Sequence, residues 1–234
     1  MSSRAKPPRD EVAEEQPPGP ERAHVALSFA IETERLVLRA HRPSDVRALR
    51  NFAMENDAHL RPWSPRPRAR EAARSIVEVA KRVAVQRKLW REDRGYVFAV
   101  TLRAAGARAG QGPIIGRVAL DEVVRGPFQN AYLGYAIAAA AQGRGLAREA
   151  VAGALGFAFA VARLHRVQAA IMPNNARSLA LARALGLREE GLARAYLAID
   201  GGFRDHVLFA VTREEWLARA PLQQFQGSWS LTRG

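Results

Sequence analysis

The feature that most constrains the fold is a glycine-containing loop, Ala-Gln-Gly-Arg-Gly-Leu-Ala, at residues 141–147. Residues 131–137 before it are short, aromatic and apolar, which is typical of a buried strand. Residues 148–163 after it are rich in alanine, with apolar side chains at helical spacing. Glycines at such a junction let backbone N–H groups point into one space at the positive end of a helix. The loop therefore predicts a binding site for a pyrophosphate.

The residues of this loop exclude two common phosphate-binding motifs. No Gly-Lys-Ser/Thr follows it, as a Walker loop requires, and Arg148 stands where the dinucleotide fingerprint has its third glycine. The loop instead resembles the Gln/Arg-x-x-Gly-x-Gly/Ala loop of GCN5-related N-acetyltransferases (GNAT), with Gln142, Gly145 and Ala147 in the pattern. An ordinary glycine turn at a helix start is the alternative.

Composition narrows the class of protein. With 234 residues, 48% of them hydrophobic, the chain can form one core with a tail or two. No apolar run approaches the roughly 20 residues of a membrane span, and no signal-peptide segment is seen, so we expect a cytoplasmic protein without a membrane partner. The absence of cysteine excludes disulfides, thiolate metal sites and cysteine-linked intermediates. The five histidines lack metal-ligand spacing, so we expect no metal.

The net charge of +13 is carried almost wholly by arginine. A basic surface favours polyanions such as coenzyme phosphates, ribosomal RNA or acidic peptides. The alternative is that the arginine bias reflects the nucleotide composition of the genome. Charge therefore supports a class of partner without establishing one.

The pattern of the chain predicts one domain at residues 25–220, a disordered tail at 1–24 and a C-terminal extension at 221–234. A helix is expected to begin at Pro43, and others span residues 69–91, 148–163 and 176–185. Strands are expected at residues 34–39, 96–102, 114–120, 131–137, 166–171, 193–199 and 206–211. The predicted fold is mixed α/β (α+β), mainly antiparallel, with one parallel step linked by a helix.

A longer resemblance extends from about residue 31 to about residue 216. The chain is similar over this length to the RimJ/RimL branch of the GNAT superfamily. The segments that carry the resemblance include Tyr132-Leu133-Gly134-Tyr135, Gln142-Gly143-Arg144-Gly145, Met172-Pro173-Asn174-Asn175, Arg177-Ser178, Ile199-Asp200-Gly201 and Arg204-Asp205-His206-Val207-Leu208.

The resemblance implies a twisted sheet splayed between the family's fourth and fifth strands, with acetyl-CoA lying in the splay. The pyrophosphate would bind the backbone of the loop that contains Gln142, Gly143, Arg144, Gly145, Leu146 and Ala147. A backbone N–H near Ile137 would stabilise the oxyanion. The acceptor amine would attack the thioester directly, which agrees with the absence of cysteine.

Asn175 and Ser178 match the family's Asn-x-x-Ser element. The resemblance implies that Asn175 contacts the coenzyme and that the Ser178 hydroxyl lies beside the departing sulfur as a catalytic group. The alternative is that both residues only cap the helix that they open.

The general base is not evident from the sequence. Many superfamily members have a glutamate where this chain has Tyr132, and a tyrosine is a poor base at pH 7. Asp121, Glu122 and Asp205 remain as carboxylate candidates, acting directly or through water. Asp205 could serve in catalysis, bind the substrate ammonium, or form a structural salt bridge with Arg204 or Arg166.

Three aromatic residues are candidates for the acceptor side. The resemblance implies that Trp63 lines an apolar wall for a small N-terminal side chain, and that Tyr132 and Tyr196 border a peptide groove. Two of them have an alternative, since Trp63 could join two helices and Tyr196 could fill a hairpin.

The resemblance implies transfer of an acetyl group to the N-terminal amine of a protein, specifically a ribosomal protein that begins with alanine. The alternatives are an acetyltransferase of a small amine (aminoglycoside, polyamine or amino-acid conjugate) and a ribosome-associated binding factor with a vestigial site. We expect a monomer or weak dimer that contacts the ribosome.

Overall fold

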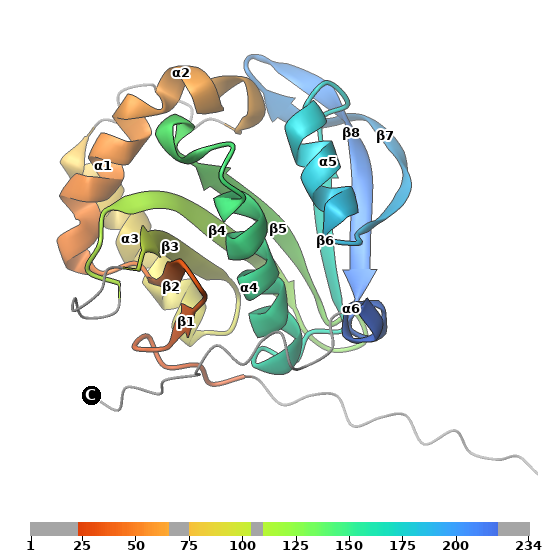
Figure 1. The fold of residues 1–234 in the computed structure, drawn as a ribbon, viewed down its shortest axis with the longest axis horizontal. Helices are drawn as coiled ribbons and strands as arrows, with labels where there is room; N and C mark the ends of the chain where they lie inside the picture. The colour runs from red at the N-terminus through yellow and green to blue at the C-terminus, as the bar shows by residue number, and fades with distance from the viewer. Residues whose placement is uncertain (1–22, 66–74, 104–109, 220–234) are drawn as a thin grey trace, which may run out of the picture.

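The computed structural model describes residues 23–65, 75–103 and 110–219 (Figure 1). Most of the predicted tail, residues 69–74 of the second predicted helix and all of the predicted C-terminal extension lie outside the described residues. The domain boundaries therefore stay a prediction. Of the described helices, none combines the length and apolar character that crossing a membrane requires.

The centre of the fold is an eight-stranded sheet whose order is β1-β2-β3-β4-β5-β6-β8-β7. The strands are β1 (Ala30–Glu32), β2 (Leu36–Ala40), β3 (Tyr96–Leu102), β4 (Ile114–Val124), β5 (Asn130–Ile137), β6 (Arg166–Ile171), β7 (Arg188–Ile199) and β8 (Gly202–Thr212). Six of the seven pairings are antiparallel, and the β5–β6 pairing is parallel. The predicted mixed sheet with one parallel step is confirmed.

Helices cover both faces of this sheet (Figure 1). The α-helices are α1 (Val46–Glu55), α2 (Asp57–Leu60), α3 (Ile76–Arg91), α4 (Leu146–Ala160), α5 (Ala176–Ala184) and α6 (Arg213–Arg219). Short 3-10 helices are η1 (Pro43–Asp45), η2 (Arg61–Trp63) and η3 (Ala139–Ala141). The helix α4 forms the crossover that a parallel strand pair requires, because it joins β5 to β6.

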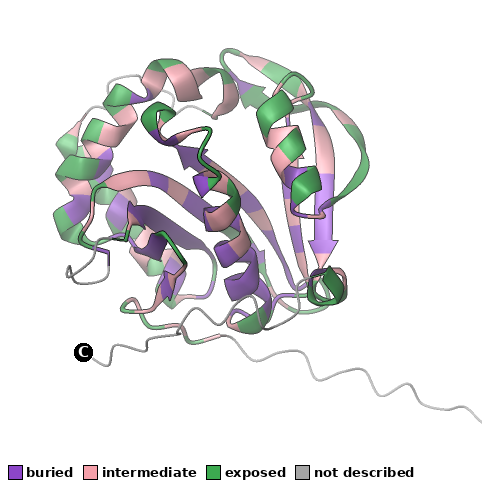
Figure 2. Ribbon diagram, in the orientation of Figure 1, coloured by how far each residue is buried: buried purple, intermediate pink, exposed green. Residues whose placement is uncertain are grey.

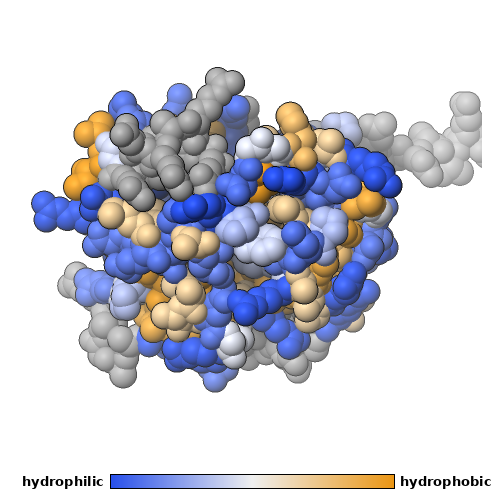
Figure 3. All heavy atoms as spheres, turned by 90° about the horizontal axis from the view of Figure 1, so that it is seen from above, coloured by the Kyte–Doolittle hydropathy of each residue, from blue (hydrophilic) through white to orange (hydrophobic). Residues whose placement is uncertain are grey.

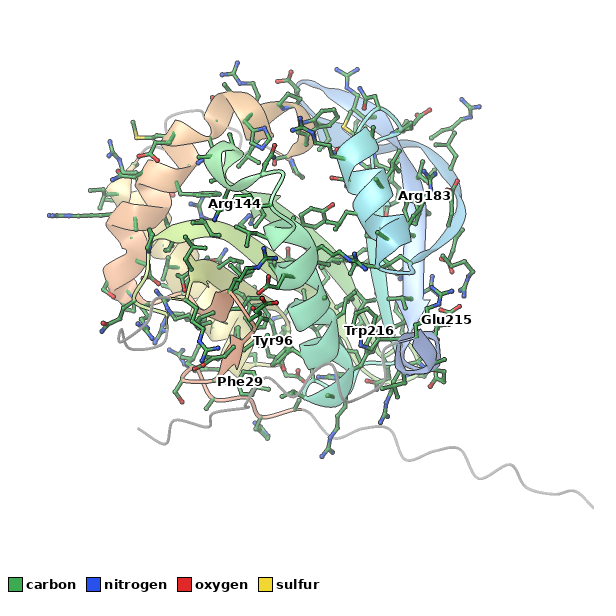
Figure 4. All side chains as sticks on the ribbon, in the orientation of Figure 1. Phe29, Tyr96, Arg144, Arg183, Glu215 and Trp216 are labelled. Atoms are coloured by element: carbon green, nitrogen blue, oxygen red, sulfur yellow. The ribbon has the colours of Figure 1, made fainter. Side chains whose placement is uncertain are left out.

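The main core lies between α4 and the strands β2 to β5. Figure 2 shows that α4 is buried along most of its length, whereas α5 is largely exposed. Four aromatic rings pack at its centre, with centroid distances of 4.9–6.0 Å between Trp90, Tyr96, Phe98 and Phe157. Phe29 adds a fifth ring against Phe157, and Figure 4 shows Phe29 and Tyr96 at the same end of the molecule.

The sheet opens between β5 and β6. These strands pair at three positions only, from Asn130↔Arg166 to Tyr132↔Gln168, although β5 continues for five more residues. Figure 1 shows the two strands close together near α6 and apart at the opposite end. This is the expected splay, and the two diverging strands are the fifth and sixth of this chain because β1 precedes the strands that were predicted.

The strands β4, β7 and β8 are longer than predicted, and β1 and α6 were not predicted. Both β4 and β7 contain register shifts, between Asp121 and Val124 and between Ala193 and Leu197. Such irregularities interrupt the alternation by which a strand is recognised. A tight turn at Asp200-Gly201 joins β7 to β8, since both residues have positive φ and Ile199 pairs with Gly202.

Candidate active site

The glycine loop leads directly into α4, as the sequence predicts. Gly143 and Gly145 have φ angles of 72° and 74°, and Gly145 is the N-cap of α4. The first backbone bond of the helix runs from Glu149 N–H to Gly145 O, at 3.1 Å. The amides of Leu146, Ala147 and Arg148 therefore have no partner within the helix and point outward at its positive end. This end of α4 can bind a phosphate.

Glu149 connects this loop to the segment before β2. Its carboxylate accepts from Thr33 Oγ1 at 2.6 Å and from Arg35 N and Nε at 2.8 and 2.7 Å. Arg35 Nη1 also donates to Arg144 O at 2.9 Å, so Arg35 binds the loop backbone directly. Burial alone would raise the pKa of Glu149, but the bonds from Thr33 and Arg35 hold it below its ordinary value. Its charge is therefore neutralised before any phosphate binds.

Gln142 joins three elements around the loop. Its Oε1 accepts from Arg177 Nη1 of α5 at 2.6 Å, and its Nε2 lies 2.6 Å from His59 Nε2 of α2. Because the amide nitrogen can only donate, His59 Nε2 is the acceptor in this arrangement. Gln142 thus lies between the acceptor-side helix α2 and the helix α5 across the splay. The sequence analysis did not identify His59 or Arg177 as partners of this loop.

A second contact joins the acceptor side to the loop region. Asn56, buried at the α1–α2 junction, accepts from Ala139 N at 2.9 Å and donates to Phe52 O at 2.9 Å. Trp63 lies on η2, directly after α2, and is half-buried. Its predicted contact with the acceptor stays a prediction.

Asn175 and Ser178 open α5 on the opposite side of the splay. Asn175 is the N-cap, and its Oδ1 accepts from Ser178 N at 3.2 Å. The capping role that the sequence left open is therefore confirmed for Asn175. It determines where Ser178 sits on the first turn, and it leaves the predicted coenzyme contact of Asn175 untested.

The amide of Ile137 points into the splay. The next residue, Ala138, donates its N–H to Ile115 O at 2.8 Å, on the β4 side of β5. Successive N–H groups of a strand point to opposite edges, so that of Ile137 points toward the edge from which β6 has diverged. This is the direction that an oxyanion donor needs.

Tyr135 also lies on the part of β5 that no longer pairs with β6, and the sequence analysis did not assign it a role. Its hydroxyl is buried and makes no hydrogen bond to any residue within the described ranges. A buried hydroxyl without a partner is uncommon, so its position beside the proposed coenzyme path is informative. The pattern of the strand could place Tyr135 on the face opposite Tyr132, but could not show that its hydroxyl lacks a partner.

The other face carries Tyr132 and Tyr196 together. Burial, followed by the neighbouring Tyr132 phenol and the charge of Glu122, raises the pKa of Tyr196. The Tyr196 ring also contacts His206 of β8, with centroids 5.7 Å apart. Next to Tyr132, a side chain at Gly134 would meet no heavy atom within 4 Å, so the sheet surface is hollow there. The two predicted acceptor-side tyrosines therefore lie beside an open space.

Two of the candidate bases, Asp121 and Asp205, differ in their surroundings. Asp121 pairs with Tyr132 in the sheet register. Its side chain is open to solvent, yet desolvation by the surrounding protein, opposed by Arg117 and reinforced by Glu122, raises the pKa of this carboxyl. Asp205 instead accepts from Ala195 N at 2.8 Å, with Arg194 3.8 Å away, and so supports the irregular part of β7. Among the described ion pairs, none joins Asp205 to Arg204 or Arg166, and Arg166 pairs with Glu190 instead.

Figure 3, which views the molecule from above, shows a mostly hydrophilic face with small, separated hydrophobic areas. Figure 4 shows Arg144 in the loop, beside the N-terminal end of α4. Among the described residues, no group of three or more His, Asp or Glu side chains is arranged to hold a metal ion.

Comparison with known proteins identifies the family. The sequence matches the acetyltransferase (GNAT) domain over residues 35–188. The chain is 34% identical over 187 residues to the ribosomal protein uS5-alanine N-acetyltransferase of Escherichia coli (strain K12), a match that covers 80% of this chain and 92% of that protein.

Two solved structures share the fold. RimJ of Mycobacterium smegmatis, solved in complex with CoA-disulfide, is 31% identical with a TM-score of 0.71, covering 77% of this chain and 83% of that one. The ribosomal-protein-S5-alanine acetyltransferase of Vibrio fischeri is 30% identical with a TM-score of 0.72, covering 80% and 98%. The chain therefore belongs to the GNAT family and is an N-acetyltransferase.

Proposed function

We propose that this protein transfers the acetyl group of acetyl-CoA to the N-terminal amine of a ribosomal protein that begins with alanine. The observation that carries the proposal is the similarity to the E. coli uS5-alanine N-acetyltransferase, which extends over 92% of that enzyme. The glycine loop, the splay and the tyrosine pair beside Gly134 supply the three parts that such a reaction needs.

The loop and the splay suit acetyl-CoA as the acetyl donor. The outward amides of Leu146, Ala147 and Arg148 would bind the pyrophosphate, with Gln142, Gly143, Arg144 and Gly145 forming the turn. The unpaired edge of β5 offers backbone groups to the amide-containing arm of the coenzyme. The Ile137 N–H would then bind the carbonyl oxygen as negative charge develops on it.

The reaction is a direct attack by the acceptor amine. The nitrogen lone pair forms the bond to the acetyl carbon, the C–S pair goes to the sulfur, and one proton leaves the nitrogen. We propose that Asp121 receives this proton, directly or through water, because it lies beside Tyr132 and its pKa is raised toward that of the amine. Asp205 is the less suitable base, since its carboxylate already accepts from Ala195 N.

The weakness of this base favours an N-terminal amine over a lysine. A free amino terminus has a pKa of about 7.7–8.0, so a useful fraction is neutral at physiological pH. A lysine, near 10.4, would need a stronger base. Trp63, Tyr132 and Tyr196 would border the acceptor groove, which is open above Gly134.

The test is incubation with acetyl-CoA and a panel of peptides, read by mass spectrometry. The panel contains one sequence with alanine, serine or leucine at its first position, and a version with a blocked terminus and an internal lysine. We expect the alanine and serine peptides to exceed the blocked peptide, free polyamines and aminoglycosides by at least about tenfold in kcat/KM. Preferential acetylation of the lysine peptide or of a small amine would overturn the proposal.

A further inference from the structure

Tyr135 has an unusual environment for a buried phenol. It lies three residues past the last β5–β6 pair, in the segment of β5 that borders the splay. Its side chain is on the face opposite Tyr132 and Gly134, because side chains alternate along a strand. Its Oη is buried and has no hydrogen-bond partner among the described residues. We therefore expect the hydrogen-bond partner of this hydroxyl to be a bound ligand.

The neighbour of this hydroxyl is the first turn of α5. Burial raises the pKa of Tyr135, and the Ser178 side chain opposes that shift, which places the two hydroxyls close to each other. An effect that lowers the pKa is that of a donor facing the phenol oxygen, and no described residue accepts from the Tyr135 O–H, so Tyr135 keeps a free donor. A phenol with a raised pKa stays protonated at pH 7–8 and can donate throughout this range.

We propose that Tyr135 is a catalytic residue whose hydroxyl donates a hydrogen bond to the sulfur of acetyl-CoA as the thioester breaks. This inference rests on the proposed function. The amine forms its bond to the acetyl carbon, the C–S electron pair goes to sulfur, and the thiolate is stabilised by the Tyr135 O–H. The proton lost by the amine goes to the base described above, and the thiolate takes up a proton from solvent after release.

The phenol is better suited to this task than the serine alone. In water a tyrosine hydroxyl ionises near pH 10, much nearer to a thiol at about 8.5 than an aliphatic hydroxyl does, and Ser178 opposes the rise in pKa that burial causes at Tyr135. Hydrogen-bond donors of matched acidity stabilise a developing anion more effectively. Ser178 then acts as a second donor on the same sulfur, from the opposite side of the splay.

The test compares Tyr135→Phe with a matched variant, Tyr96→Phe. Each removes one phenol hydroxyl, but Tyr96 bonds to Asp93 at 2.5 Å in the structural core, away from the proposed site. We expect Tyr135→Phe to lower kcat by about tenfold or more with an unchanged acetyl-CoA Kd and an unchanged Tm, because no bond is lost in the free protein. Tyr96→Phe should lower Tm and leave kcat unchanged.

Two further measurements test the role of Tyr135 without depending on which acceptor the enzyme uses. Hydrolysis of acetyl-CoA without an acceptor uses the same leaving group, and Tyr135→Phe should slow it by a similar factor even if no peptide is a substrate. Adding Ser178→Ala to Tyr135→Phe should lower kcat by less than the product of the single effects. A Tyr135→Phe variant with wild-type kcat and hydrolysis rates, or one whose Kd rises by the same factor as kcat falls, would refute the role.

Discussion

The buried ion pair between Arg39 and Asp45 gives a stability prediction whose size follows from the structure. Arg39 Nη1 and Nη2 donate to Asp45 at 2.6 and 2.9 Å, and the Arg42 N–H donates to the same carboxylate at 2.6 Å. The side chains are only 6% and 10% exposed. The pair joins β2 to the start of α1, the helix that is followed by Asn56, whose side chain bonds to Ala139 just before the glycine loop.

Replacing Asp45 by alanine leaves the Arg39 guanidinium buried without its counter-charge. Breaking a buried pair in this way costs about 3–5 kcal/mol, a large part of the 5–15 kcal/mol that stabilises a typical domain. The control is Glu78→Gln, which removes an exposed pair with Lys81 and should cost about 0.5 kcal/mol or less. The side chains of this pair are 44% exposed for Glu78 and 67% exposed for Lys81. Urea unfolding at pH 7.5, followed by circular dichroism, measures both.

The same pair predicts a pH dependence. Burial alone would raise the pKa of Asp45, but the bonds from Arg39 and Arg42 hold it below its ordinary value. The stabilisation is therefore fully present above the unfolded-state pKa, near 3.9, and is lost as the pH falls through the lower folded-state value. Equal unfolding free energies for Asp45→Ala and Glu78→Gln would refute the reasoning. The double variant Arg39→Met/Asp45→Leu removes both charges and should recover part of the lost stability. A double variant less stable than Asp45→Ala would therefore also refute the reasoning.

Three further predictions concern the site. Gly145→Glu should abolish acetyl-CoA binding in calorimetry, whereas Gly145→Ala, which shares the strain of a positive φ without the charge, should weaken it much less. The value of kcat/KM should rise up to roughly pH 8 and then flatten, as an N-terminal amine loses its proton; a plateau already reached at pH 6 would contradict this. Glu149→Gln should reduce the loss of stability below pH 4, measured by thermal unfolding, because the pKa of Glu149 is lowered in the folded protein.

The order of the central strands and helices could be predicted because their apolar periods are clear. The strand at residues 96–102 and that at 166–171 match β3 and β6. The helix α6 was missed although Thr212 and Glu215 carry its start signal: Glu215 Oε2 accepts from Thr212 N at 2.9 Å, and Thr212 Oγ1 accepts from Glu215 N at 3.3 Å. The strand β1 has three residues and too short a pattern to be recognised.

The site was predictable only where a local pattern determines it. The loop at residues 142–147 and the Asn175 cap depend on the conformation of neighbouring residues, so their sequence is informative. His59 and Gln142 are bonded although they are 83 positions apart in the sequence. The Tyr135 hydroxyl is free because no described residue around it is placed to form a hydrogen bond with it. Neither has a signature in the chain, because tertiary contacts alone create them.

The three-pair junction of β5 and β6 also affects how this protein can move. An eight-stranded sheet joined there by so few backbone bonds consists of a five-stranded part and a three-stranded part, with α4 as the covalent link between them. Small rotations about that junction disturb few hydrogen bonds, so the width of the opening can change while each part stays rigid. We expect amide hydrogen exchange to be fast at the inner edge of β5 beyond Tyr132 and to slow when acetyl-CoA bridges the two parts.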